Sequence, residues 1–175
     1  KKQEGNYFDN FLGLDFNYDK RNQKFQTTSG FFSNYSVDIP VLSDTNTLMN
    51  TYNYKIFKEL YDENVSTLSF LIKSSTSITG DNVKLSERLY IPPRRLRGFE
   101  AGKVGPKDGS DYVGGNYISS INATSTIPKI LENIQSVDIV MFADVGNIWG
   151  VDYNTSLDTD EIRSSVGVGL DWLTQ

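Results

Sequence analysis

The residues best suited to specific recognition lie in one stretch, residues 92–115, which is rich in arginine and glycine. Leu96, Phe99 and Val104 offer apolar anchors, and Arg97 offers a charge that can pair with a carboxylate elsewhere. The glycines allow tight backbone paths that a plain linker does not need. The stretch separates two alternating runs and is far longer than the roughly 2–5 residues of an ordinary hairpin loop, which is typical of a functional segment. We expect this loop to dock onto another part of the protein.

Composition excludes the common kinds of catalytic chemistry. The chain has no histidine and no cysteine, so Ser-His and Cys-His nucleophiles and a conventional zinc site are ruled out. The segment that begins at Asp152 opens like a calcium loop, but Leu157 and Arg163 occupy the positions that need glycine and glutamate, which indicates a solvated loop. Asp158 and Asp160 lie in the same polar segment, with no apolar run nearby to form a catalytic pocket. We predict no catalytic residue, no metal and no cofactor, and we do not expect an enzyme.

The elements that must position the loop are β-strands. Apolar and polar residues alternate with a period of two along most of the chain, and turn-forming residues separate the runs. Residues 79–82 are typical of a tight hairpin, and residues 128–136 of a turn that can hold a short helix. The alternation predicts eight strands, at residues 7–18, 28–39, 47–60, 66–78, 83–91, 116–126, 137–149 and 162–173.

The two faces of these strands differ in polarity. In the seventh, Met141 lies on the apolar face and Asp144 on the polar one; in the eighth, Val168 is apolar while Gly167 and Gly169 share the polar face. A soluble β-sandwich would also bury one apolar face of each strand. Glycines and charges together on the opposite face suit a wide membrane barrel, whose polar lumen can receive a loop. The alternation alone does not decide between the two.

Composition agrees with a membrane barrel and excludes some partners. The net charge of −5 leaves no basic face for nucleic acid. Ten phenylalanines, ten tyrosines and many small polar residues suit strands that face lipid on one side and water on the other. The sequence has no apolar run of about 18 residues that would predict a transmembrane helix, and its first residues do not resemble a signal peptide.

Several motifs, taken in order, resemble a known family. Leu96-Arg97-Gly98-Phe99, then Gly105-Pro106, then Gly114-Gly115-Asn116 follow the order and spacing of the sixth extracellular loop in the BamA family of outer-membrane protein assembly factors. Residues 142–149 resemble the family's strand F-x-D-x-G-x-x-W, and residues 163–172 resemble the strand that follows it.

The resemblance implies a fold. Family members have periplasmic POTRA domains followed by a sixteen-stranded barrel in the bacterial outer membrane. Residues 1–175 then form a fragment of the C-terminal barrel domain, equivalent to strands seven to fourteen. The fold class expected is all-β: an antiparallel up-and-down meander forming a partial transmembrane β-barrel of about eight strands out of sixteen. The POTRA domains, the first six strands and the last two would lie outside this chain.

The resemblance also implies a site. In the family, the loop folds back into the lumen and the motif arginine reaches acidic residues on the inner wall. Here these roles fall to Arg97 and Asp144, and Asp144 has the polar parity of its strand. A count from Asn116 places Thr124 where the family has a second acidic residue, so Arg97 is expected to have one carboxylate and one hydroxyl partner.

Three functions remain open from the sequence. The resemblance implies an insertase that folds and inserts outer-membrane β-barrel proteins without a cofactor. Its implied partners are the lipid bilayer, unfolded clients and accessory lipoprotein subunits. A translocator of the same superfamily, of the two-partner secretion type, would instead export a polypeptide, although Phe99 in place of tyrosine and the motif spacing favour assembly. A soluble carbohydrate-binding β-sandwich would also suit the aromatic and asparagine content.

Overall fold

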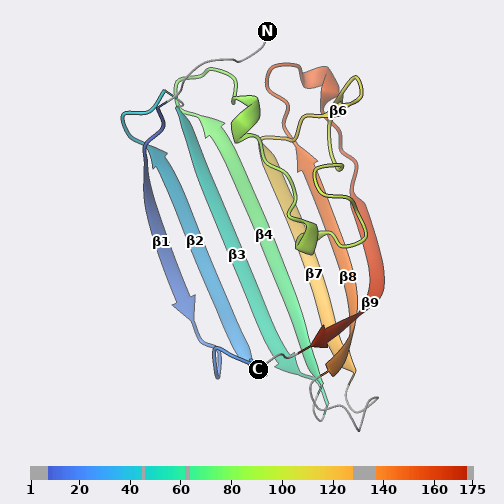
Figure 1. Cartoon of the computed structure of the whole chain (residues 1–175). Coiled ribbons are helices and arrows are strands. Elements are labelled where there is room, and N and C mark those ends of the chain that lie inside the picture. The colour runs from blue at the N-terminus through green and yellow to red at the C-terminus, as the bar shows by residue number, and fades with distance from the viewer. Residues whose placement is uncertain (1–7, 45, 62–63, 128–136, 173–175) are drawn as a thin grey trace.

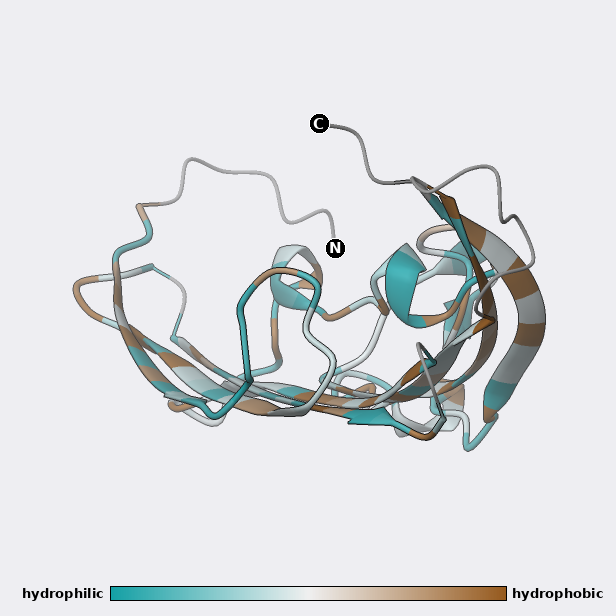
Figure 2. Cartoon of the chain, turned by 90° about the horizontal axis from the view of Figure 1, so that it is seen from below, coloured by the Kyte–Doolittle hydropathy of each residue, from teal (hydrophilic) through white to brown (hydrophobic). Residues whose placement is uncertain are grey.

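Seven long strands form one antiparallel sheet. The computed structural model describes residues 8–44, 46–61, 64–127 and 137–172. The strands follow the order β1-β2-β3-β4-β7-β8-β9, so each long strand pairs with the next one along the chain. Their bounds are β1 Phe11–Asp19, β2 Gly30–Pro40, β3 Thr47–Glu59, β4 Val65–Ser77, β7 Tyr117–Ile127, β8 Val137–Trp149 and β9 Arg163–Trp172. The sheet curves into an open trough (Figures 1 and 2), which confirms the predicted up-and-down antiparallel wall.

The long connection between β4 and β7 lies on the concave side of this trough, over β7 and β8 (Figure 1). It contains two 3₁₀-helices, η1 (Leu85–Glu87) and η2 (Pro93–Arg95), and a small hairpin of β5 (Lys107–Asp108) with β6 (Asp111–Tyr112). A third 3₁₀-helix, η3 (Thr155–Leu157), lies in the connection from β8 to β9. Within the described ranges, no helix has the length and apolar character needed to cross a membrane.

The strand register gives each face of the sheet a continuous chemical character. On the convex face, Ala143 lies opposite Ala123 on one side and Val166 on the other. Large apolar side chains on this face remain uncovered, and Val166 is 82% exposed. On the concave face, the neighbouring rung places Asp144 between Asn122 and Ser165. The convex face is therefore apolar, and the concave face supplies the polar groups that meet the loop.

The prediction of a fifth long strand at residues 83–91 is wrong. Residues 85–87 form η1, and within the described residues a bridge between Leu89 and Gly115 is the segment's one β-type pairing. Burial does not follow the predicted alternation: Leu85 is exposed, whereas Ile91 is buried in a cluster with residues of the wall. Residues 79–82 accordingly lead into this docked segment and not into a hairpin strand.

The other strands agree with the sequence to within a few residues. The bounds of β8 are those predicted, residues 137–149. The first strand begins at Phe11, and the predicted turn at residues 128–136 lies outside the described residues.

Candidate functional site

The centre of the site is the contact between Arg97 in the loop and Asp144 on β8. The Arg97 side chain donates two hydrogen bonds to the carboxylate, from Nε to Oδ2 at 2.8 Å and from Nη2 to Oδ1 at 2.7 Å. The Arg97 backbone N–H donates a third to Oδ2 at 3.0 Å. Asp144 has no exposed surface, so its charge depends on these donors. The predicted pair is confirmed, in the bidentate geometry that arginine favours.

The second inner-wall partner is Asn122 on β7, and the prediction of Thr124 is wrong. Asn122 lies directly opposite Asp144 and donates to its Oδ1 at 2.8 Å. Thr124 lies two residues further along β7, opposite Phe142, and makes no hydrogen bond with Arg97 within the part of the chain described. A side-chain amide thus stands where a hydroxyl was expected. It donates to the carboxylate, so it supports the ionised form of Asp144 without adding a second negative charge.

An aromatic ring completes the seat of Arg97. The guanidinium carbon lies 3.8 Å from the centroid of the Phe142 ring, close enough for a cation–π contact. A Cβ atom built on Gly167 would lie 2.5 Å from the Phe142 ring, so only glycine leaves room for the ring at this point of β9. Sequence reasoning took Gly167 as room for the loop; the structure gives that room to Phe142, which lies beneath the loop's arginine.

A second arginine ties the loop to a more distant strand. Arg95 donates from Nη2 to the side-chain oxygen of Asn53 on β3 at 3.0 Å, and from Nη1 to that of Asn122 at 3.2 Å. Asn122 in turn donates to the Arg95 backbone carbonyl at 2.8 Å. The loop therefore contacts polar groups of three wall strands. The sequence has three arginines within four positions, and nothing in their spacing showed that Arg95 would take this role.

Apolar packing holds the loop as well as polar contacts. Leu96 is 2% exposed and joins a buried cluster that includes Val104 from the loop and Leu71, Ile118 and Ile148 from the concave wall. Phe99 is half-buried and packs against this cluster. The lumen was expected to be polar, but part of the wall beneath the loop is apolar. The burial of these side chains favours the docked position because it removes apolar surface from water.

The predicted glycines permit close approach between the loop and the wall. Gly105 has a φ of +103°, and a Cβ there would lie 2.9 Å from Cβ of Ile148. A Cβ on Gly115 would lie 2.4 Å from the carbonyl oxygen of Trp149, a distance that no real side chain tolerates.

The remaining motif residues support the same loop path. Gly98 and Gly114 both have positive φ, and Pro106 is buried and accepts a hydrogen bond from the Val113 backbone N–H at 3.1 Å. Asn116 marks the end of the loop, where its backbone N–H donates to the Gly150 carbonyl at 2.8 Å.

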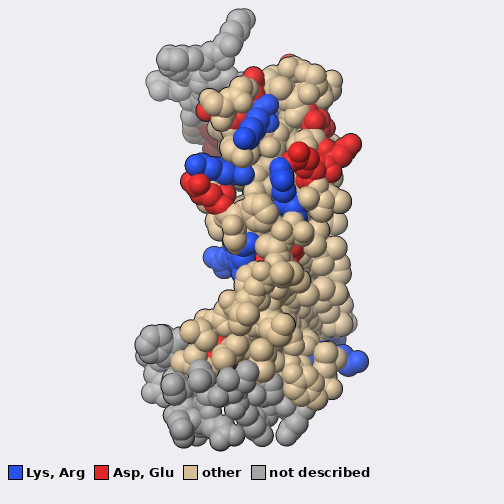
Figure 3. Space-filling model, turned by 90° about the vertical axis from the view of Figure 1, so that its right-hand side faces the viewer, with Lys and Arg blue, Asp and Glu red and all other residues tan. Residues whose placement is uncertain are grey.

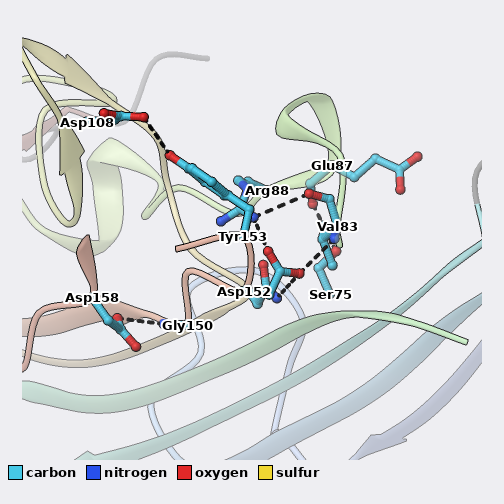
Figure 4. Close-up of polar contacts among 10 residues, drawn as sticks. Ser75, Val83, Glu87, Arg88, Asp108, Gly150, Asp152, Tyr153 and Asp158 are labelled. Carbon is cyan, nitrogen blue, oxygen red and sulfur yellow. Dashed lines mark hydrogen bonds and ion pairs between the residues drawn. The ribbon is translucent and has the colours of Figure 1, made fainter. Parts of the chain in front are cut away.

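A second polar cluster fixes the base of the loop, around Asp152 (Figure 4). Arg88 forms an ion pair with Asp152, and Asp152 also accepts hydrogen bonds from the Val83 backbone N–H at 2.7 Å and from Asn116 at 2.9 Å. Burial opposes ionisation, but the hydrogen bonds from Asn116 and Val83 and the charge of Arg88 outweigh it and lower the pKa of Asp152 below its usual 3.8. The solvated loop predicted here is therefore wrong at Asp152, because its partners lie far away in sequence and meet it only in the fold.

Charged residues are distributed unevenly along the wall. Lys, Arg, Asp and Glu side chains gather mainly over the end of the sheet that carries the loop, and the flank below them is mostly uncharged (Figure 3). This distribution suits a wall that crosses an apolar layer and carries its charged loops outside it. The site itself has the chemistry of a clamp: it holds a loop against a wall by a charge pair, a ring contact and an apolar cluster.

Comparisons with known proteins agree with this geometry. The model of the Omp85 superfamily domain matches residues 1–174. The outer membrane protein assembly factor BamA of Neorickettsia risticii (strain Illinois) is 30% identical over 122 residues, which cover 66% of this chain and 16% of that protein. The crystal structure of BamA from Haemophilus ducreyi lacking POTRA domains 1–3 superposes with a TM-score of 0.82 at 22% identity, over 94% of this chain and 36% of that one. The chain thus spans a minor part of the relatives it matches. With the family model covering nearly every residue, and the loop docked on an open antiparallel wall, the chain belongs to the Omp85 superfamily.

Proposed function

We propose that this chain is part of the barrel wall, with its internal loop, of an assembly factor in the bacterial outer membrane that folds and inserts other β-barrel proteins. The docking of Arg97 on Asp144 carries the proposal, because it joins the family's loop motif to the inner wall through a built contact. The apolar convex face supports it too, since such a face is stable only against lipid or another apolar surface. The matched relative from Neorickettsia risticii bears the name of an outer membrane protein assembly factor.

In this proposal the loop acts as an internal brace. A wide wall of long strands can bend along its length, whereas a loop that contacts β3, β7 and β8 together holds these strands in one curvature. Insertion of a client then needs no covalent chemistry and no cofactor, only a rigid wall in a bilayer, so the protein is not an enzyme. The clients are unfolded outer-membrane β-barrel proteins, and accessory lipoprotein subunits complete the assembly.

The test is a charge exchange in the full-length protein that contains this chain. Arg97→Glu places two acids against each other, and Asp144→Arg places two cations together, so each is expected to reduce assembly by removing about 1–3 kcal/mol of charge-assisted hydrogen bonding and adding repulsion. The double variant restores opposite charges and is expected to recover part of the loss, with Phe99 and the apolar cluster still seating the loop. The readout is the amount of folded outer-membrane protein in cells depleted of the wild-type factor.

Arg94→Glu is the matched control. Arg94 is exposed in the same loop, and its substitution changes the net charge as much as Arg97→Glu does. We expect nearly normal assembly in this variant. Wild-type assembly in both single variants of the Arg97–Asp144 pair would refute the proposal that loop docking supports function.

A further inference from the structure

The convex face of the sheet contains a groove that the proposed function does not use. It has a volume of about 800 Å³, near the upper end of the range of about 300–1,000 Å³ that is usual for small-ligand sites. Strands β3, β4, β7, β8 and β9 all contribute to its lining. Most of its lining residues, such as Ala143 and Val166, lie on the face opposite to that of Asp144, so the groove is on the side of the wall away from the loop.

The groove exists because two small residues face each other across a strand pair. Ala123 on β7 lies directly opposite Ala143 on β8 and forms the floor with it. Leu68 on β4 and Val166 on β9 flank this floor on the same rung. On the next rung toward the loop, Ile121 takes the place of alanine in β7 and closes the groove at that end. The result is an apolar channel with bulky sides and a shallow floor.

The rung on the other side of the floor adds one charge to an otherwise apolar lining. It contains Lys58, Ser66 and Ser125 beside the apolar Met141 and Val168. The two serine hydroxyls lie 2.9 Å apart, and both are hydrogen-bonded to Asn64. Lys58 is exposed and forms no ion pair with any residue of the described ranges. These groups lie near the end of β3 and the start of β4, whereas the long loop follows the opposite end of β4. The groove thus acquires one cation on the side away from the loop, next to the apolar Met141 and Val168.

We infer that this groove binds a glycerophospholipid of the membrane leaflet opposite the long loop. One acyl chain would lie over Ala123 and Ala143, and the phosphate would meet the Lys58 ammonium, with the serine hydroxyls near the glycerol esters. The match rests on charge complementarity at one end and apolar burial along the rest, the two features that an anionic amphiphile requires. The inference rests on the proposed function, because that function places the convex face in a bilayer.

The experiment uses the full-length protein in proteoliposomes that contain phosphatidylglycerol with a photoactivatable group on one acyl chain. After illumination, mass spectrometry locates the labelled peptides. Peptides from β7 and β8 that line the groove are expected to carry several-fold more label than peptides from the convex face of β2. Ala143→Phe fills the floor and is expected to abolish this excess. Val37→Phe adds a ring to the convex face of β2, away from the groove, and is expected to leave the excess unchanged.

A second pair of variants tests the charged end without altering the floor. Lys58→Gln is expected to lower the labelling of the groove by the anionic lipid several-fold, and Lys58→Arg to preserve it. Even labelling along the whole convex face, or an excess that survives both Ala143→Phe and Lys58→Gln, would overturn the groove as a lipid site. Failure of the wild-type protein to insert into the vesicles at all would instead refute the membrane function from which the inference starts.

Discussion

Asp144→Asn removes the charge that holds the loop and leaves the size of the side chain unchanged. In the native protein the carboxylate accepts three hydrogen bonds from Arg97, at 2.7, 2.8 and 3.0 Å, and one from Asn122 at 2.8 Å. A side-chain amide has only one acceptor oxygen, and its NH₂ group would face donors of Arg97 or Asn122. At least two of the four bonds are therefore lost.

The size of the effect follows from these contacts. A hydrogen bond to a charged group contributes about 1.5–3 kcal/mol. The Arg97 side chain is 32% exposed, so water replaces part of each lost bond, and the stacking on Phe142 remains. We expect the docked state to be destabilised by about 2–3 kcal/mol. At about 1.4 kcal/mol per factor of ten, the equilibrium constant for opening of the loop rises roughly 30- to 150-fold.

Hydrogen exchange measured by mass spectrometry on the full-length protein in nanodiscs gives this equilibrium directly. Backbone amides of residues 94–105 are expected to exchange faster by that factor, while those of β2 and β3 keep their protection. Asp138→Asn is the control, because Asp138 has the same parity on β8 and makes no hydrogen bond to the described part of the loop. Unchanged exchange in Asp144→Asn, or an equal increase in Asp138→Asn, would refute the reasoning.

Two further predictions concern the faces of the wall and the base of the loop. Val166→Lys places a charge on the exposed convex face, on the apolar rung of Ala123 and Ala143, and is expected to cost about 2–4 kcal/mol of folding in vesicles, measured by urea titration. Gly169→Lys, on the concave face where an added Cβ meets nothing within 4 Å, is expected to cost far less, and equal penalties would show that the assigned faces are wrong. Because the pKa of Asp152 is lowered in the folded protein, its contact with Arg88 is expected to stabilise the fold above the usual pKa of 3.8 and to weaken as pH falls below it. Pepsin cleavage within residues 83–91, followed between about pH 5 and pH 2 and divided at each pH by the cleavage of an unstructured peptide because pepsin itself titrates in this range, should rise on acidification in the wild type. The same ratio should stay high in Asp152→Asn, whereas a flat wild-type ratio would contradict the assignment.

The parts of the fold that the sequence predicted are those where one face is uniformly apolar. In β8 the alternation is unbroken, so both its bounds and the inward direction of Asp144 could be read from it. The pairing of Arg97 with Asp144 came from the resemblance to the family, and the polar parity of Asp144 on its strand agreed with it. The strand bounds and the parity need only local information, whereas the pairing needed the family motif.

The parts that failed depend on contacts between distant segments. A period of two cannot distinguish a strand within a sheet from an extended segment that lies on a sheet, which is why residues 83–91 were assigned to a strand. Thr124 and Asn122 lie on the same face of β7, two residues apart. The register between β7 and β8 decides which of them lies opposite Asp144, and the sequence of β7 alone does not fix that register. Asp152 is 64 residues from Arg88, and no local pattern joins them.

The loop is held by side chains from different strands, and this has a consequence for the order of folding. Asp144 belongs to β8 and Asn122 to β7, so neither hairpin strand alone presents the complete seat. Arg97 precedes Asp144 by 47 residues, and a chain that is made from its N-terminus completes the loop well before the carboxylate that receives it. Until β8 has paired with β7, Arg97 lacks its carboxylate, although Arg95 can already reach Asn53 and Asn122. The loop can therefore be held in part by β3 and β7 first, and the pairing of β8 then completes its seat with Asp144.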